Sequence, residues 1–166
     1  MHGDPTWVSG THEHRASLNR FVCATPAKPL WDRRRGTHHP EPWSLAVQSW
    51  FRRLRPPLPA SEGLLLGMVD DDVAAACHFG FDTSWEQFIV FAIGTSRDVQ
   101  RRGLGSEALR LSLDILDQNR RRLEMDCGVF TRIHRSNTAS RALFASQGFE
   151  YLGVEGDYEN WVGTTG

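Results

Sequence analysis

Several features that would assign a protein to a common functional class are scarce or missing in this 166-residue sequence. Cysteine is rare: Cys23, Cys77 and Cys127 lie far apart and outside any C-x-x-C pattern. This spacing argues against a disulfide framework and against a structural zinc site. The sequence therefore predicts no bound metal, and its cysteine usage favours a reducing, cytoplasmic location.

Long apolar runs and an excess of one charge are also missing. No run of about 18 apolar residues occurs, so we expect no membrane association. The opening stretch MHGDPTWVSG lacks the basic and apolar regions of a signal peptide. Lys and Arg number 19 against 20 for Asp and Glu, and the net charge of −1 gives no general attraction to nucleic acid. Any phosphate binding must therefore be local.

Length and periodicity indicate one domain that contains both helices and strands. Residues 1–18 show no sustained period and predict a flexible N-terminal segment, which precedes a domain over residues 19–166. The local patterns predict strands over residues 20–24, 63–69, 73–81, 87–94 and 123–130, and helices that begin near residues 42, 104 and 137.

Aromatic residues form a stripe on the predicted helix over residues 42–54. Core packing is the usual role of such a stripe, and a wall that stacks against a ligand is the less favoured alternative. Pro56 and Pro57 should end this helix. The stripe consists of Trp43, Ala46, Val47, Trp50, Phe51 and Leu54, with Gln48, Ser49, Arg52 and Arg53 on the opposite side.

A glycine loop stands between the apolar strand that ends near Thr95 and the next helix. A helix N-terminus has unpaired backbone N–H groups and a partial positive charge, so a loop without Cβ atoms lets an anion approach closely. Gly103 and Gly105 supply this freedom, and Arg101 and Arg102 add donors that suit phosphate oxygens. The stretch predicts a pyrophosphate site, and a tight turn without a ligand is the alternative.

Two well-known phosphate loops do not match this stretch. A Walker loop needs Gly-Lys followed by Ser or Thr, and that sequence is missing from the chain. A dinucleotide fingerprint needs a third glycine three positions after Gly105, where Ala108 stands.

The wider stretch VQRRGLGSEAL resembles the acyl-CoA motif (Q/R)-x-x-G-x-(G/A) of the GNAT superfamily of N-acyltransferases, with Gln100, Gly103 and Gly105 in the defining places. The stretch NTASRALFASQGFEYLG resembles the second landmark of the family, with Asn137 as helix N-cap and Gly148 after the helix. The resemblance implies an α/β (α+β) fold: a central mixed, mostly antiparallel sheet of about six to seven strands flanked by helices.

The resemblance also implies a function. It implies an N-acetyltransferase that transfers the acetyl group of acetyl-CoA to a primary amine of a small molecule or protein by direct attack. Backbone amides around residues 100–106 would hold the pyrophosphate, and the strand near residues 93–95 would splay from its neighbour and pair with the pantetheine arm. The implied cofactor-binding residues are Ile93, Gly94, Thr95, Gln100, Arg101, Arg102, Gly103, Leu104, Gly105, Ser106, Asn137 and Phe144.

Phe144 departs from the family pattern, in which many members have a tyrosine that protonates the leaving thiolate. A phenyl ring cannot donate a proton, so water or another residue must do so, or the thiolate leaves unprotonated. A catalytically impaired acyl-CoA-binding module is therefore an alternative.

Candidate general bases are His78 and Glu86, and His134 is a further histidine near the expected cleft. Each has an ordinary structural alternative, as a buried histidine or a solvated loop charge. If none of them serves, ordered water would be the base.

Two stretches, WDRRRG and WFRRLRPP, combine tryptophan with arginines, as in some RNA-binding surfaces. Acylation of aminoacyl-tRNA, as by toxin-like relatives, is the alternative that they raise. Acidic residues cancel this positive charge over the whole chain, so we do not expect a nucleic acid partner. The expected partners are acetyl-CoA and an amine acceptor, and a homodimer stays open because relatives often dimerise.

Overall fold

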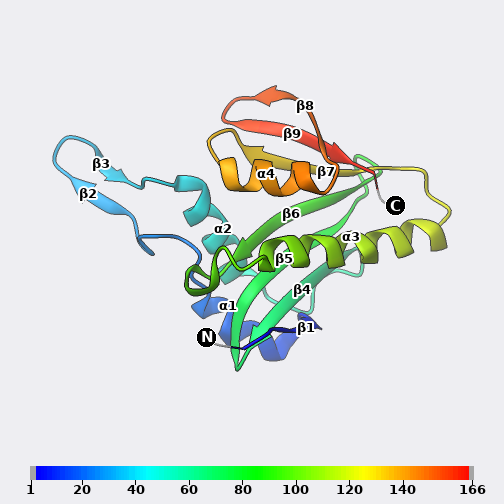
Figure 1. The fold of residues 1–166 in the computed structure, drawn as a ribbon, viewed down its shortest axis with the longest axis horizontal. Helices are drawn as coiled ribbons and strands as arrows, with labels where there is room; N and C mark the ends of the chain where they lie inside the picture. The colour runs from blue at the N-terminus through cyan, green and yellow to red at the C-terminus, as the bar shows by residue number, and fades with distance from the viewer. Residues whose placement is uncertain (1–2, 165–166) are drawn as a thin grey trace.

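The computed structural model describes residues 3–164. Seven strands form one sheet in the order β1-β4-β5-β6-β7-β9-β8 (Figure 1). Within the described chain, β6 and β7 run parallel and the other neighbouring strands of this sheet are antiparallel, which confirms the mixed, mostly antiparallel fold. The strands are β1 (Thr6–Ser9), β4 (Glu62–Val69), β5 (Asp72–Asp82), β6 (Gln87–Thr95), β7 (Val129–His134), β8 (Glu150–Glu155) and β9 (Tyr158–Gly163).

Among the described residues, four α-helices flank the sheet, two on each face. They are α1 (Arg15–Arg20), α2 (Pro42–Arg53), α3 (Leu104–Arg122) and α4 (Thr138–Ser146). One core lies under α3 and α4 and includes Leu109, Leu116 and Phe144. A second core lies under α1 and α2 and includes Leu18 and Phe51 (Figure 1). The sheet is thus buried on both faces, which explains the nearly all-apolar central strands.

A short hairpin of β2 (Leu30–Asp32) and β3 (Gly36–His38) projects from the body between α1 and α2 (Figure 1). Its turn carries Arg33, Arg34 and Arg35. The Asp32 carboxylate accepts hydrogen bonds from the Arg34 and Arg35 amides at 2.8 and 2.6 Å, so the aspartate shapes the turn.

The expected flexible segment over residues 1–18 differs from the structure, which places β1 and most of α1 within it. β1 pairs with β4 in antiparallel register, Thr6 opposite Met68. Leu18 is fully buried, and the Ser17 hydroxyl donates to the Asp71 carbonyl at 2.7 Å. Four strand residues are too few to show a period, so only the tertiary pairing reveals them. Residues 1–2 and 165–166 of the expected segment and domain lie outside the described residues, and the domain boundary stays a prediction.

The strand predicted over residues 20–24 is wrong. Arg20 ends α1 and the following residues are irregular. Side chains from other elements bond this backbone in place of a strand partner: Arg52 donates to the Phe21 carbonyl at 2.8 Å, and Ala24 N–H donates to Gln48 at 3.2 Å. Gln48, expected on the polar side of the helix, is therefore buried.

The meander of β4, β5 and β6 confirms the predicted hairpin and third strand, and it carries one irregularity. His78 is paired with Ala92 and Phe79 with Val90, so Phe91 has no partner on β5. This extra residue is a β-bulge, a feature that bends a strand and increases its twist. The bulge lies where β6 begins to separate from β7.

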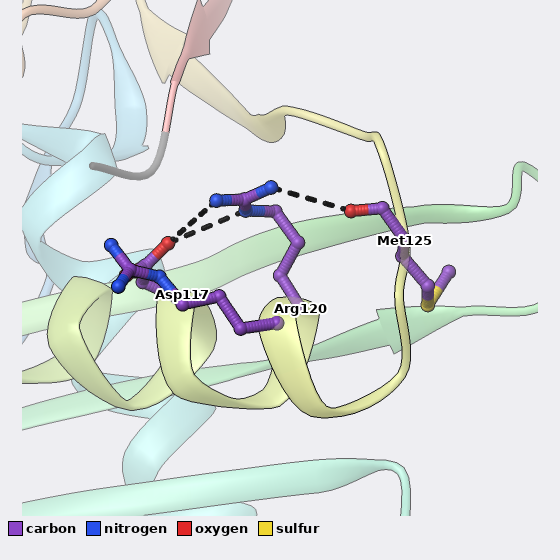
Figure 2. Close-up of polar contacts among 4 residues, drawn as sticks. Asp117, Arg120 and Met125 are labelled. Carbon is purple, nitrogen blue, oxygen red and sulfur yellow. Dashed lines mark hydrogen bonds and ion pairs between the residues drawn. The ribbon is translucent and has the colours of Figure 1, made fainter.

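The C-terminus of α3 is held by a polar cluster that directs the chain toward β7 (Figure 2). Arg120 donates to the Asp117 carboxylate at 3.0 Å and to the Met125 carbonyl at 3.5 Å. The strand predicted over residues 123–130 is only partly right, because β7 runs from Val129 to His134 and the residues before it form a turn and an irregular segment.

The helix predicted at residue 137 is confirmed as α4. The Asn137 side chain accepts a hydrogen bond from the Ser140 amide at 3.1 Å, as an N-cap does. Gly148 follows the helix with a φ of 83°, the left-handed conformation that glycine adopts without strain.

Candidate functional site

β6 and β7 pair at one end and separate at the other, which opens the sheet. Their register runs from Phe88 opposite Val129 to Val90 opposite Thr131 and then stops, although β6 continues to Thr95 and β7 to His134. At the last pair, the buried Thr131 hydroxyl donates to the Val90 carbonyl at 3.0 Å. The expected splay of β6 from its neighbour is thus present.

Replacing Thr131 with valine should destabilise the protein by about 1–3 kcal/mol, because the buried Val90 carbonyl loses its donor while the shape of the side chain is kept. Urea denaturation of parent and variant measures this difference. Thr131→Ser retains the hydroxyl and is the matched control. A valine variant as stable as the parent would show that this bond does not hold the end of the ladder.

A cavity of about 710 Å³ occupies the opening and extends to both faces of the sheet. On the α4 side it is lined by Asn137, Ser140 and Phe144, and on the α2 side by Trp43 and Trp50. Phe130, Arg132 and His134 of β7, together with Tyr158 and Asn160 of β9, form its floor on the α2 side. A molecule entering from one face can therefore meet a molecule entering from the other.

The glycine loop lies after β6, at the N-terminus of α3. Arg101 and Gly103 both have positive φ, at 64° and 80°. The Gln100 side chain donates to the Cys23 carbonyl at 2.9 Å and to the Thr95 carbonyl at 3.3 Å, and so ties the loop to the segment after α1 and to the end of β6. These bonds hold the loop in a bent conformation beside the opening of the sheet.

The same loop fits an anionic group. The amides of residues 104–106 open α3, and within the described chain they donate no hydrogen bond to another element. A Cβ added at Gly103 would meet no atom within 4 Å, so this side of the loop is open. At Gly105 an added Cβ would lie 3.4 Å from the Thr95 hydroxyl, which shows how closely α3 approaches β6. Free amides, open space and two exposed arginines suit a phosphate.

The sequence model of the Acetyltransferase (GNAT) family matches residues 28–149, which cover the sheet opening, the glycine loop and α4. The chain belongs to this family. It is therefore an acyl-CoA-dependent N-acyltransferase, with acetyl-CoA as the donor. No curated protein sequence matches the chain.

Solved structures share the GNAT fold at low sequence identity. The PaiA N-acetyltransferase of Thermoplasma acidophilum, solved with coenzyme A, has a TM-score of 0.69 and 11% identity, covering 96% of this chain and 98% of that one. The ribosomal-protein-S18-alanine N-acetyltransferase of Escherichia coli has a TM-score of 0.60 and 16% identity, covering 95% and 89%. Protein PH1933 of Pyrococcus horikoshii OT3 has a TM-score of 0.54 and 15% identity. That match covers 62% of this chain and 65% of PH1933.

The structure does not bring all the residues expected to bind acetyl-CoA to the cavity. Ile93, Asn137 and Phe144 line the cavity, whereas the loop over residues 100–106 lies outside its lining, beyond the end of β6. Gly94 faces α2, since an added Cβ would lie 3.0 Å from Val47. The assignment of these residues to the cofactor stays a prediction.

His78, a candidate base, lies behind the cavity wall and not in its lining. The side chain is buried, and both ring nitrogens are occupied: Nδ1 accepts from the Trp50 indole N–H at 3.0 Å, and Nε2 lies 2.7 Å from the Glu62 carboxylate. Because Nδ1 is an acceptor, the neutral ring carries its proton on Nε2 and donates it to Glu62. The ring thus positions Trp50.

Lowering the pH should destabilise the protein through His78. Burial lowers the pKa of His78 below its usual value of 6.5, an effect that Glu62 partly offsets. The unfolded chain then binds this proton more tightly, so the free energy of unfolding is highest above pH 6.5 and falls as the pH drops toward the folded-state pKa. Urea midpoints should fall from about pH 7 to pH 5, and fall less in His78→Phe. Equal falls in both proteins would contradict this assignment.

Glu86 and His134 occupy different places. Glu86 is exposed in the turn between β5 and β6 with a φ of 50°, and it does not line the cavity. His134 does line it, stacked on Trp43 with ring centroids 4.9 Å apart. Its Nδ1 accepts from the Ser136 amide at 3.1 Å, so the neutral ring presents Nε2–H as a donor.

The aromatic stripe of α2 has two roles, and its interpretation as core alone is wrong. Phe51 is fully buried, whereas Trp43, Val47 and Trp50 line the cavity. The helical period marks one apolar side but does not say which part of that side faces an opening. Sequence reasoning missed the further lining residues Trp85, Gln87, Ile89, Phe91, Phe130, Arg132, Glu155, Tyr158 and Asn160.

Two further findings concern metals and membranes. Within residues 3–164, no group of three or more His, Cys, Asp or Glu side chains is arranged to hold a metal ion. The helices of that same range include none with the length and apolar character needed to cross a membrane.

Proposed function

We propose that this enzyme transfers the acetyl group of acetyl-CoA to a primary amine of a small molecule or protein by direct attack. The observation that carries the proposal is the cavity in the sheet opening, which joins the α4 side to the α2 side between β6 and β7. The thioester would enter from the α4 side and the amine from the α2 side.

The bond changes need no covalent enzyme intermediate. The amine nitrogen attacks the thioester carbonyl carbon, the C–S bond breaks, CoA leaves as the thiolate, and the nitrogen loses a proton to solvent. Backbone N–H groups of β6 beyond Val90 lie outside the β6–β7 ladder and could stabilise the oxyanion.

The amine must be neutral when it attacks. His78 and Glu86 do not line the cavity, and the Nε2 of neutral His134 already carries a proton. The lining is largely apolar, and burial in such surroundings lowers the pKa of an amine. The amine therefore enters in its neutral form, and the proton that it loses after attack passes to water.

Phe144 supports a reaction without a side-chain acid. The ring is buried, and its centroid lies 5.0 Å from that of Phe149 in an edge-on arrangement. The thiol of CoA has a modest pKa, so CoA can leave as the unprotonated thiolate. Phe144→Tyr should therefore leave kcat within about twofold of the parent, and a gain of tenfold or more would show that a missing acid limits the enzyme.

Acceptor-dependent release of CoA tests the proposal. Purified protein, freed of ligand, is given acetyl-CoA with and without a panel of primary amines, and the CoA thiol is measured with the acetylated product. Release that requires an amine supports acetyl transfer. Slow hydrolysis that no amine accelerates, in a protein that still binds acetyl-CoA, would point to the binding module.

A further inference from the structure

The α2 side of the cavity is built mainly from aromatic side chains that come from separate parts of the chain. They are contributed by α2, by the turn between β5 and β6, and by β6, β7 and β9. Flat rings at this density form surfaces on which another flat apolar group can stack. The residues are Trp43, Trp50, Trp85, Phe91, Phe130 and Tyr158.

The charges in this region are few and balanced. Among the lining residues, only Arg132 and Glu155 carry a formal charge at neutral pH, and their side chains approach to 4.0 Å. A polyamine or another multiply charged acceptor would need several carboxylates to replace its hydration. One carboxylate, already beside an arginine, suits a monoamine that enters in its neutral form, as the proposed transfer requires.

Trp50 is held in place by the buried His78, whose other ring nitrogen contacts the partly exposed Glu62. Its indole N–H donates to His78 Nδ1 at 3.0 Å, and His78 Nε2 lies 2.7 Å from Glu62 Oε2. The Phe91 ring at the bulge lies 4.8 Å from the His78 ring and stacks beside Trp50 at 6.3 Å, with 19° between the last two planes. The relay Glu62–His78–Trp50 therefore fixes the orientation of the indole.

The fixed indole is not fully covered. Trp50 lines the cavity and keeps 37% of its surface exposed, and Trp85, another lining residue, keeps 74%. Ordering a side chain before binding lowers the entropic cost of complex formation. The fixed indole of Trp50 is thus a preformed surface for a flat ligand.

Resting on the proposed acetyl transfer, we propose that the acceptor is a monoamine carried on a flat apolar group, an arylalkylamine in its simplest form, which stacks against Trp50. Glu62 and His78 act as positioning residues for that indole. The amine nitrogen points toward the opening between β6 and β7, where the thioester carbonyl would lie.

A panel of probes tests the acceptor class. Tryptamine and 2-phenylethylamine are compared with 2-cyclohexylethylamine, which has similar size without a flat ring, with spermidine, and with a peptide that has a free N-terminal alanine. We expect the two arylalkylamines to have the lowest KM, about threefold or more below that of cyclohexylethylamine, because paired aromatic rings attract each other beyond the effect of their buried area. Spermidine and the peptide should have kcat/KM at least about tenfold lower.

Variants test the relay separately. Trp50→Leu should raise the KM for tryptamine about tenfold and leave the KM for acetyl-CoA within about twofold. His78→Phe and Glu62→Leu should raise the tryptamine KM about threefold, whereas Glu62→Gln keeps an acceptor for His78 and should behave as the parent. Trp31→Leu, in the projecting hairpin, is the matched control for loss of an exposed indole. If the relay is purely structural, these variants should have lower melting temperatures, but the ratio of the KM for tryptamine to the KM for acetyl-CoA should not change.

Binding is measured as well as turnover, so that the two proposals can fail separately. Calorimetric titration of tryptamine into the protein with CoA bound should show one site. Tryptamine binding without CoA release from any amine would overturn acetyl transfer and keep this site. Acetylation of spermidine or the peptide in preference to the arylalkylamines would keep acetyl transfer and overturn this inference, as would an unchanged tryptamine KM in Trp50→Leu.

Discussion

Replacing Gly103 with glutamate should abolish the rise in melting temperature that acetyl-CoA produces in the parent protein. The residue has a φ of 80° and faces open space beside the free amides of α3. A carboxylate there would fill the proposed phosphate site and repel the pyrophosphate. At 100 times Kd a ligand stabilises the folded state by about 2.7 kcal/mol. For a chain of this size that corresponds to a shift of roughly 5–11 °C.

The control must separate ligand loss from backbone strain, because any side chain in the left-handed conformation costs about 1 kcal/mol or more. Gly36 is a matched control position. Its φ is 64°, a Cβ added there would also meet no atom within 4 Å, and the residue lies in the β2–β3 hairpin. Gly36→Glu should lower the melting temperature by a similar amount and keep the acetyl-CoA response. A response retained in Gly103→Glu, or missing from the parent at millimolar acetyl-CoA, would mean that the loop is only a turn.

Phe51→Ala should destabilise the protein by about 3–5 kcal/mol. The side chain is 0% exposed and meets Phe21 edge-on, with centroids 5.4 Å apart. It belongs to the core that holds α1 and α2 on the sheet. Domains are stable by only about 5–15 kcal/mol, so this loss is a large part of the total. Guanidinium denaturation with a circular-dichroism readout measures it.

Phe51→Leu retains most of the buried surface and should lose far less than the alanine variant. Trp31→Ala is the exposed control, because Trp31 is 73% exposed and its truncation should change stability by less than about 0.5 kcal/mol. A loss below about 1 kcal/mol for Phe51→Ala would show that the α2 core can collapse into the vacated space. The placement of Trp50 would then owe little to Phe51, its neighbour in α2.

The features that follow from local chemistry were predicted well. The glycine loop, the Asn137 N-cap and Gly148 depend on backbone conformations and hydrogen bonds within a few residues. The hairpin of β4 and β5 follows from two apolar runs around acidic turn residues. Four-residue β1 and the segment after α1 were not predicted correctly, because their backbone partners come from β4, Gln48 and Arg52, far away in sequence.

By itself, the sequence determined the fold family, the place of the glycine loop and the use of acyl-CoA, since these depend on short motifs in a fixed order. Only the tertiary structure decided which side chains line the cavity between β6 and β7. Helical period marks Trp43, Trp50 and Phe51 alike as apolar, yet the separation of β6 from β7 exposes the first two to a cavity and buries the third. The same packing places His78 behind Trp50 and leaves Glu86 outside the cavity. Whether a side chain reaches a cavity depends on which surfaces the other helices and strands cover, and the local sequence does not specify this.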